Sequence, residues 1–182
     1  MGFPILFLFK ISNRCDRMLI GWFEVVANKL GIINYERLEQ IENKIVSVKI
    51  ELLDENSNFN MTDLNLEFLI RIHKFLFGDI YYDDYLAPRT LNPDEFEKVH
   101  SIFELLVQIG AFRQNLELIP ELFIRLWEMQ IFRDGNTRTL YAFLKIYVAG
   151  YQLPIEYKKD LNISSGKSFV LNMCQQKIVD NI

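Results

Sequence analysis

The sequence contains little cysteine and little histidine, and their scarcity excludes several kinds of site. Among its 182 residues there are two cysteines, Cys15 and Cys174, and two histidines. Two cysteines so far apart make neither a disulfide framework nor a metal site, and they are typical of a reducing cytosol. His73 has no cysteine, histidine or acidic partner at metal-ligand spacing, so we expect a packed or surface histidine. A cytoplasmic protein is therefore expected.

An excess of basic charge and a long apolar run are also missing. The chain has 20 Lys and Arg against 24 Asp and Glu, whereas a nucleic-acid-binding protein normally carries a basic patch. The apolar run at residues 3–9 is too short to span a bilayer and lacks the features of a signal peptide. Either this run packs on the domain or Met18 lies closer to the biological start. We expect no nucleic-acid partner and no membrane span.

Apolar residues, in contrast, are abundant. Half of the chain is hydrophobic and 15 residues are Phe, so a single globular domain with a substantial core is expected. Asn34 and Thr62 are in position to begin helices, and Gly31 to end one. Apolar residues recur at helical spacing in residues 12–30, 34–53, 64–77, 95–112, 118–129 and 140–148, with a last helix from Ile163.

A short polar stretch, residues 130–139, separates two of these apolar helices. Asp134-Gly135 is a turn signal, and Asn136 is a favourable N-cap for the helix that follows. A helix N-terminus offers unpaired N–H groups and positive potential, which makes it a natural anion site. Gly135 lets a ligand approach the backbone closely.

Two charged side chains beside this turn indicate which anion would bind. Arg138 offers a planar guanidinium that suits phosphate oxygens. Asp134 is placed to hold Mg²⁺, which commonly binds through one or two carboxylates together with substrate phosphates. The stretch therefore predicts a site for Mg²⁺ and a nucleoside polyphosphate. The alternative is a capped helix start with a local Asp134–Arg138 pair.

The same residues resemble the motif H-x-F-x-[DE]-G-N-G-R-x-x-R of the Fic family. Phe132, Asp134, Gly135, Asn136 and Arg138 fall on its positions. Fic proteins are all-helical, and most transfer AMP from ATP onto a hydroxyl side chain of a target protein. The resemblance implies nucleotide contacts from Phe132, Gly135, Asn136 and Arg138, with Asp134 as the metal ligand.

Three positions depart from that motif. Gln130 stands where the family has its catalytic His, Thr137 replaces the second Gly at a nucleotide-binding position, and Tyr141 replaces the second Arg. The resemblance places Gln130, Asn136 and Arg138 at catalytic positions. In the family the His deprotonates the target hydroxyl, which then attacks the ATP α-phosphate, and a Gln amide is not a useful base at neutral pH. The resemblance therefore implies an adenylyltransferase-like site with Mg and ATP as ligands and a weakened base.

A second segment, residues 76–90, resembles the Fic segment L-F-x-D-[IV]-Y-x-W-A-G-x-x-R-T. In the family a β-hairpin flap follows the R-T pair and positions the target hydroxyl by strand pairing. Here Leu91-Asn92 alone separate Thr90 from Pro93, which is typical of a helix start. A shortened or absent flap is therefore predicted.

The helix at residues 34–53 contains a third resemblance. Ser47, Ile50 and Glu51 match the S-x-x-I-E-G form of the family's inhibitory motif, [ST]-x-x-x-E-[GN]. In the family this Glu pairs with the second Arg of the motif and displaces the ATP γ-phosphate. Because Tyr141 stands at that position, Glu51 would pair with Arg138 or with no charged residue. The alternative is one exposed Glu on an amphipathic helix.

The resemblance covers roughly residues 47–153 and implies an all-α fold, a helical bundle with at most a short β-hairpin flap. We predict an N-terminal helical extension at 1–33, a Fic-like core at 34–155 and a C-terminal helix at 156–182 of the same domain. Two functions stay open: slow or specialised AMP transfer to a protein hydroxyl, and nucleotide or protein binding without catalysis. The sequence indicates neither the target protein nor the oligomeric state.

Overall fold

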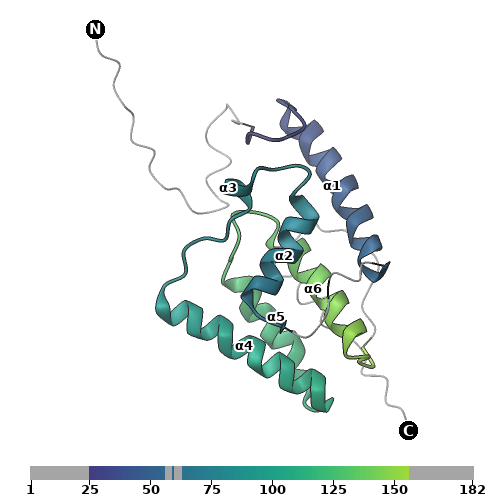
Figure 1. Cartoon of the computed structure of the whole chain (residues 1–182), viewed down its shortest axis with the longest axis vertical. Helices are drawn as coiled ribbons and strands as arrows, with labels where there is room; N and C mark the ends of the chain where they lie inside the picture. The colour runs from purple at the N-terminus through teal and green to yellow at the C-terminus, as the bar shows by residue number, and fades with distance from the viewer. Residues whose placement is uncertain (1–24, 56–58, 60–62, 156–182) are drawn as a thin grey trace.

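The computed structural model describes residues 25–55, 59 and 63–155, and these residues form a bundle of helices (Figure 1). An isolated antiparallel bridge joins Asn28 and Tyr81. The predicted all-α fold is confirmed, while the predicted helix from Ile163 lies outside the described residues. The elements are α1 (Tyr35–Glu51), η2 (Leu52–Glu55), α2 (Leu66–Phe77), α3 (Asp83–Leu86), α4 (Pro93–Phe112), η4 (Leu116–Leu118), α5 (Ile119–Glu128) and α6 (Asn136–Gly150), where η denotes a short 3₁₀ helix.

The helix predicted for residues 12–30 does not extend to its predicted end. Residues 12–24 lie outside the described part, and residues 25–30 are extended and then turn. The Asn28 side chain accepts a hydrogen bond from the Ile32 N–H at 3.0 Å and donates to the Val26 carbonyl at 3.0 Å. Such side-chain bonds to nearby backbone compete with helix formation. This prediction was therefore wrong for residues 25–30.

The next two helices begin at asparagines. Asn34 accepts a hydrogen bond from the Arg37 N–H at 2.8 Å and caps α1, as predicted. The start of α2 was predicted wrongly: its cap is Asn65, which accepts from the Phe68 N–H at 2.9 Å, and Thr62 lies outside the described residues. Both asparagines satisfy N–H groups that have no partner inside the helix.

No strand follows α3, so a flap hairpin is absent from the segment that joins it to α4. Residues 87–92 contain no paired strand. Asn92 and Glu95 form a reciprocal capping box, with Pro93 as the first residue of α4. The helix start predicted at Pro93 is confirmed, and the short connection leaves no length for a hairpin.

Helix α6 lies at the centre of the bundle, and every residue from 139 to 148 is buried. The ring of Phe143 lies 6.0 Å from that of Phe68 on α2, 5.7 Å from that of Phe103 on α4 and 5.1 Å from that of Phe123 on α5, measured between centroids. Aromatic contacts on three sides hold α6 in place. The position of its N-terminus is therefore determined by the whole bundle.

Two lysines attach α1 to this bundle. Lys145 of α6 is buried and donates to the Ile50 carbonyl at the end of α1, at 2.9 Å. Lys49 of α1 donates to the Phe75 carbonyl at 2.7 Å and pairs with Asp79, also at 2.7 Å. These bonds satisfy carbonyl groups near the C-terminal ends of α1 and α2. They fix the position of α1 alongside α2 and α6.

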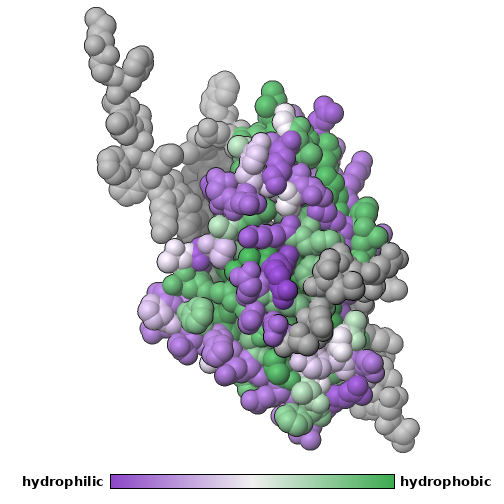
Figure 2. Space-filling model, viewed as in Figure 1, coloured by the Kyte–Doolittle hydropathy of each residue, from purple (hydrophilic) through white to green (hydrophobic). Residues whose placement is uncertain are grey.

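The outer surface is mixed in character. Hydrophilic residues lie between hydrophobic ones over the face drawn in Figure 2. Phe96, which fits the apolar spacing of α4, is 53% exposed instead of buried. Within the described ranges, no helix combines the length and the apolar character that crossing a membrane requires.

Candidate functional site

The polar stretch at residues 130–139 joins the end of α5 to the start of α6. Gly135, with φ of 73°, is the N-cap of α6, and Asn136 is its first helical residue. The prediction that Asn136 caps the helix was therefore wrong by one position. A Cβ atom added to Gly135 would lie 2.5 Å from Cζ of Phe77. Glycine is required here both by the left-handed backbone and by the close approach of α2.

Asn136 holds the loop from inside instead of capping the helix. Its side chain is 8% exposed, and its Oδ1 accepts from the Phe132 N–H at 2.9 Å. Its Nδ2 donates to the Phe132 carbonyl at 2.7 Å. This pair of bonds closes residues 132–136 into a tight loop, because a carboxamide pairs with one residue's N–H and C=O together. Asn136 is thus a structural part of the loop.

Gln130 lies at the entrance to the loop, and its side chain is exposed. Its backbone is left-handed, with φ of 44°, and its Nε2 donates to the Trp127 carbonyl at 2.6 Å. Its Oε1 lies 3.4 Å from Nδ2 of Asn136. The structure therefore brings Gln130 and Asn136 together. The amide stays neutral at ordinary pH.

Arg89 supports the same entrance from the α3–α4 connection. Its Nη2 donates to the Met129 carbonyl at 2.8 Å, and its Nε donates to the Gln130 carbonyl at 3.2 Å. Its guanidinium also pairs with Glu95 at 2.8 Å. The hydrogen bond from Arg89, followed by that from the Asn92 backbone, lowers the pKa of Glu95 to about 2. The R-T pair seen in the sequence thus fixes the backbone that leads into the loop.

Asp134 and Thr137 lie at the turn itself, and both are partly buried. Oδ1 of Asp134 accepts from the Gly135 N–H at 2.7 Å, and Oγ1 of Thr137 accepts from Nε1 of Trp127 at 3.0 Å. No group of three or more His, Cys, Asp or Glu residues that could hold a metal ion occurs in the described ranges. Any cation at Asp134 would therefore need ligand oxygens from a bound molecule.

Arg138 points from the first turn of α6 toward α1. Its Nη2 lies 2.5 Å from Oε1 of Glu42, its Nη1 donates to Oδ1 of Asn43 at 3.2 Å, and its guanidinium lies 4.7 Å from the Phe77 ring centroid. The side chains of Arg138 and Glu42 are 11% and 9% exposed. Arg138, which the sequence analysis assigned to an anionic ligand, is thus already paired with Glu42 in a largely buried ion pair.

Glu42 has a second partner, the hydroxyl of Tyr81. Burial, together with the hydrogen bond to Glu42, raises the pKa of Tyr81 well above its ordinary value, so the hydroxyl remains protonated and donates. The sequence analysis did not single out Glu42. One signal was present: Glu42-Asn43 carries the E-[GN] end of the inhibitory motif, with Leu38 where that motif has Ser or Thr.

Ser47 and Glu51 lie elsewhere on α1. Both are exposed, and Glu51 is the last residue of the helix. Nine residues separate Glu51 from Glu42, which corresponds to about 13 Å along an α-helix. The structure does not bring Glu51 to Arg138, because the part of α1 that faces the loop is its first half.

His73 of α2 lies directly beneath the loop. It is 3% exposed, and its ring stacks on Phe132 with centroids 3.9 Å apart and an interplanar angle of 6°. Nδ1 lies 2.9 Å from Oγ1 of Thr139. Burial, followed by the charge of Arg138, lowers the pKa of His73 to about 3, so the ring is neutral. Of the two predicted alternatives, a packed or a surface histidine, the structure shows the packed one.

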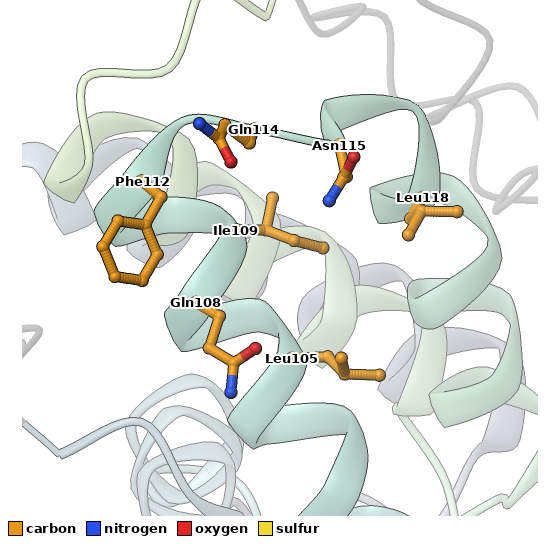
Figure 3. Close-up of a pocket in the computed structure, with 7 residues that line it drawn as sticks. All are labelled: Leu105, Gln108, Ile109, Phe112, Gln114, Asn115 and Leu118. Atoms are coloured by element: carbon orange, nitrogen blue, oxygen red, sulfur yellow. The ribbon is translucent and has the colours of Figure 1, made fainter.

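A separate hollow lies between the C-terminal end of α4 and η4 (Figure 3). Its volume is about 160 Å³. Its lining is apolar with three carboxamides and contains no charged side chain, so it offers no counter-charge to a phosphate. The lining residues are Leu105, Gln108, Ile109, Phe112, Gln114, Asn115 and Leu118.

Comparison with known proteins agrees with this architecture. Residues 63–148 match the model of the Fic/DOC family. The structure of BepC, a VirB-translocated effector protein of Bartonella tribocorum determined with bound AMPPNP, is similar at a TM-score of 0.61 and 14% identity, over 81% of this chain and 90% of that one. The N-terminal Fic domain of a Bep effector of Bartonella sp. AR 15-3 is similar at a TM-score of 0.60 and 16% identity, over 83% of this chain and 87% of that one.

A search of curated proteins found no match. At such low identities the structural similarities show a shared fold, and the family match covers α2 to α5, the loop that leads into α6, and α6 as far as residue 148. Residues 63–148 are therefore similar to the Fic/DOC family.

Proposed function

We propose that the loop at residues 130–139 binds the phosphate groups of a nucleotide, ATP or a close relative. The observation that carries this proposal is the position of Gly135 and Arg138 at the start of a buried helix. Gly135 gives the turn its left-handed backbone, and the N–H groups of the first turn have no partner inside the helix. Arg138 adds a planar donor on the same turn. The bound AMPPNP of the similar BepC structure supports a nucleotide as the ligand class.

Mg²⁺ would accompany such a ligand, with Asp134 as its protein contact. One oxygen of Asp134 is bonded to the Gly135 N–H, and the carboxylate is partly exposed. A single carboxylate suits Mg²⁺, which commonly completes its shell with phosphate oxygens and water. When bound, the ion would neutralise part of the phosphate charge. The residues at the turn therefore fit the ion, and their own role is to hold the phosphates in place.

Gln130 limits the chemistry that can follow binding. In AMP transfer, the hydroxyl oxygen of a target protein forms a bond to the α-phosphorus, the bond to pyrophosphate breaks, and the hydroxyl proton must be removed. A carboxamide does not accept that proton at neutral pH. Loss of general-base help lowers a rate by about 10²–10⁴. We therefore propose a nucleotide-binding protein whose transfer of AMP to a protein hydroxyl is slow.

A second candidate is a nucleotide- or protein-binding relative without transferase activity. The absence of a hairpin in residues 87–92 favours it, because the family's target hydroxyl is positioned by such a strand. The two candidates share the nucleotide site and differ only in the transfer step. Labelling with α-labelled ATP separates them.

Access to the site is the next property that we propose. Arg138 forms its ion pair with Glu42 of α1, so a phosphate group must displace the Glu42 carboxylate in order to contact that guanidinium. The inhibitory role predicted for Ser47 and Glu51 is therefore proposed for Glu42 of the same helix. Breaking a buried pair is costly unless a new anion replaces the lost partner, and a phosphate is such an anion.

Calorimetry with ATP and Mg²⁺ tests the binding proposal. We expect the wild type to bind, and Arg138→Lys to bind about tenfold more weakly, since a charge-assisted hydrogen bond is worth about 1.5–3 kcal/mol. Lysine keeps the positive charge facing Glu42, which protects the fold. The matched control is Arg125→Lys, because Arg125 pairs with Glu121 on the exposed side of α5. A wild type that binds no nucleotide in the presence of Mg²⁺ contradicts the proposal.

A further inference from the structure

The buried histidine of α2 has no part in the proposed phosphate site, yet it contacts the loop of that site on two sides. Its ring lies flat on Phe132, the residue that Asn136 clamps. Its Cε1 would lie 3.3 Å from a Cβ atom at Gly135, so the ring edge borders the turn. One side chain of α2 thus touches both ends of the tight 132–136 loop.

The direction of its hydrogen bond can be assigned from the neighbouring donors. Oγ1 of Thr139 lies 2.9 Å from the Gly135 carbonyl oxygen and 2.9 Å from Nδ1 of His73. The carbonyl can only accept, so the single hydroxyl proton of Thr139 lies on that bond. Nδ1 of His73 must then donate to the hydroxyl oxygen. The geometry therefore assigns His73 as the neutral tautomer with its proton on Nδ1.

This arrangement forms a chain of two bonds from α2 to the turn. His73 donates to Thr139, and Thr139 donates to the carbonyl of Gly135. The Gly135 carbonyl also accepts the Thr139 N–H at 2.9 Å, as the first bond of α6. Hydrogen bonds in a buried chain polarise and strengthen one another. The orientation of the Gly135 peptide is therefore set by His73 as well as by the helix.

We propose that His73 is a positioning residue for the nucleotide loop: it holds Phe132 with its ring face and Gly135 through Thr139, without touching the ligand. The inference rests on the proposed nucleotide function of that loop. Its physical basis is preorganisation, because a loop already held in its binding conformation loses less conformational freedom when the phosphates bind. Removing the hydrogen bond while keeping the flat ring should loosen the turn and weaken binding.

The test measures ATP binding, with Mg²⁺ present, for the wild type and four variants of the full chain. His73→Phe keeps a ring on Phe132 but cannot donate, and Thr139→Val cannot accept. We expect each to bind about three- to tenfold more weakly, the range for one lost hydrogen bond. His73→Phe/Thr139→Val should be no weaker than Thr139→Val alone, because loss of the Thr139 hydroxyl already breaks the bond from His73. Thr139→Ser, which keeps the hydroxyl, should retain wild-type affinity.

Two NMR measurements address the inference without any nucleotide. Long-range ¹⁵N–¹H spectra of the wild type should show the His73 proton on Nδ1 and none on Nε2. Amide exchange at Gly135 and Asn136 should be faster in His73→Phe and Thr139→Val than in the wild type and Thr139→Ser. If His73 merely filled space, its tautomer would not matter, and amide exchange in the loop would be the same in Thr139→Ser and Thr139→Val.

The outcomes separate the two proposals. A wild type that binds no nucleotide rejects the proposed function, while an Nδ1–H tautomer with faster loop exchange in the variants still supports the positioning role. Folded variants with wild-type affinity and wild-type exchange overturn the inference, as does a proton found on Nε2. Should His73→Phe fail to fold, the pair Thr139→Val and Thr139→Ser carries the same test.

Discussion

At the scale of single residues, Gly135 and Gly31 have the same left-handed backbone but different surroundings. Their φ angles are 73° and 64°. A Cβ atom at Gly31 meets nothing within 4 Å, whereas one at Gly135 lies 2.5 Å from Phe77. The pair therefore separates the cost of the backbone conformation from the cost of the contact with α2.

We expect Gly31→Ala to lower the free energy of unfolding by about 1–2 kcal/mol, the cost of a left-handed alanine. Gly135→Ala should lower it by about 1–3 kcal/mol more, the usual range for overpacking a filled site. Urea denaturation of both variants measures the difference. Equal losses would mean that Phe77 moves aside freely, and that the close approach of α2 does not constrain the turn.

The low pKa of His73 predicts a pH dependence of stability. In the unfolded chain a histidine titrates near 6.5, whereas in the native protein the pKa is about 3, mainly through burial and also through Arg138. Between these values the unfolded state binds more protons, so the free energy of unfolding falls as the pH falls below 6.5. At pH 5 the loss is about 2 kcal/mol, at 1.36 kcal/mol per pH unit.

His73→Phe isolates this contribution. The difference in stability between wild type and variant should shrink as the pH is lowered from 6.5 to 5, because the carboxylates titrate similarly in both proteins. Chemical denaturation at several pH values provides the curve. A difference that is constant with pH would show that the native ring accepts a proton as readily as the unfolded one.

Residue identity predicted the composition of the loop but not all of its contacts. Gln130, Asp134, Asn136 and Arg138 lie in one short stretch of the sequence, and Gln130 and Asn136 contact each other. The pairing of Arg138 with Glu42 spans most of the described chain and depends on the rotation of α1 about its own axis. The sequence analysis chose Glu51 because Ser47 and Ile50 complete the inhibitory motif there, whereas Leu38 stands at the Ser or Thr position before Glu42.

At the scale of helices, α1 contacts Arg138 of the proposed nucleotide loop through the ion pair of Glu42 and the hydrogen bond to Asn43. Glu42→Gln removes the charge while keeping an oxygen that can accept from Tyr81 and Arg138. We expect this variant to bind ATP about tenfold more tightly, since the phosphates no longer compete with a carboxylate. It should also be less stable by about 1–3 kcal/mol, because a buried charged partner is lost.

Glu51→Gln on the same helix is the matched control, since it makes the same chemical change at an exposed position. It should leave both affinity and stability close to those of the wild type. Calorimetry and thermal unfolding of the two variants give the comparison. If Glu42→Gln and Glu51→Gln had similar ATP affinity and stability, α1 would not control access to the site.

Helix boundaries were predicted where a cap and a following apolar pattern agreed, as at Asn34 and Pro93. They were missed where two capping candidates lay close together: Asn65 caps α2, and Thr62 was chosen. The prediction was also wrong at residues 25–30, where apolar residues have helical spacing but the Asn28 side chain forms hydrogen bonds with the nearby backbone. In each case a local hydrogen bond, which spacing does not report, decided the outcome.

At the scale of the whole molecule, the proposed slow transfer of AMP predicts the effect of restoring a histidine at position 130. Gln130→His is compatible with its left-handed backbone, where histidine is comparatively common. We expect it to give little labelling from α-labelled ATP, because Arg138 stays paired with Glu42 and catalytic groups that act together are not additive. Tyr141 is 3% exposed, so Tyr141→Arg would bury a charge. The effect of that substitution on labelling would reflect a change in folding.

The informative comparison is therefore among the wild type, Gln130→His and Gln130→His/Glu42→Gln. Labelling of self or lysate proteins should be lowest in the wild type and highest in the double variant. Strong labelling by the wild type would show that Gln130 does not disable transfer. Absence of labelling in the double variant, despite measurable ATP binding, would favour the binding function.

The overall fold was predictable because two motif segments resembled one family and the helical spacing agreed with it. The absence of the hairpin was also predictable, since Pro93 follows Thr90 too soon. The central position of α6 was less predictable from the sequence. Residues 139–148 are all buried, and a helix that is buried all round lacks the one-sided apolar pattern that spacing detects.

The bond between Trp127 and Thr137 has a practical consequence. The protein contains two tryptophans, Trp22 and Trp127, and the indole N–H of Trp127 is bonded to a residue of the nucleotide loop. Indole emission shifts when this hydrogen bond or the solvent exposure of the ring changes. In a Trp22→Phe background, intrinsic fluorescence would come from Trp127 alone. The contact that ties α5 to the loop therefore gives the protein its own optical signal for a ligand arriving there.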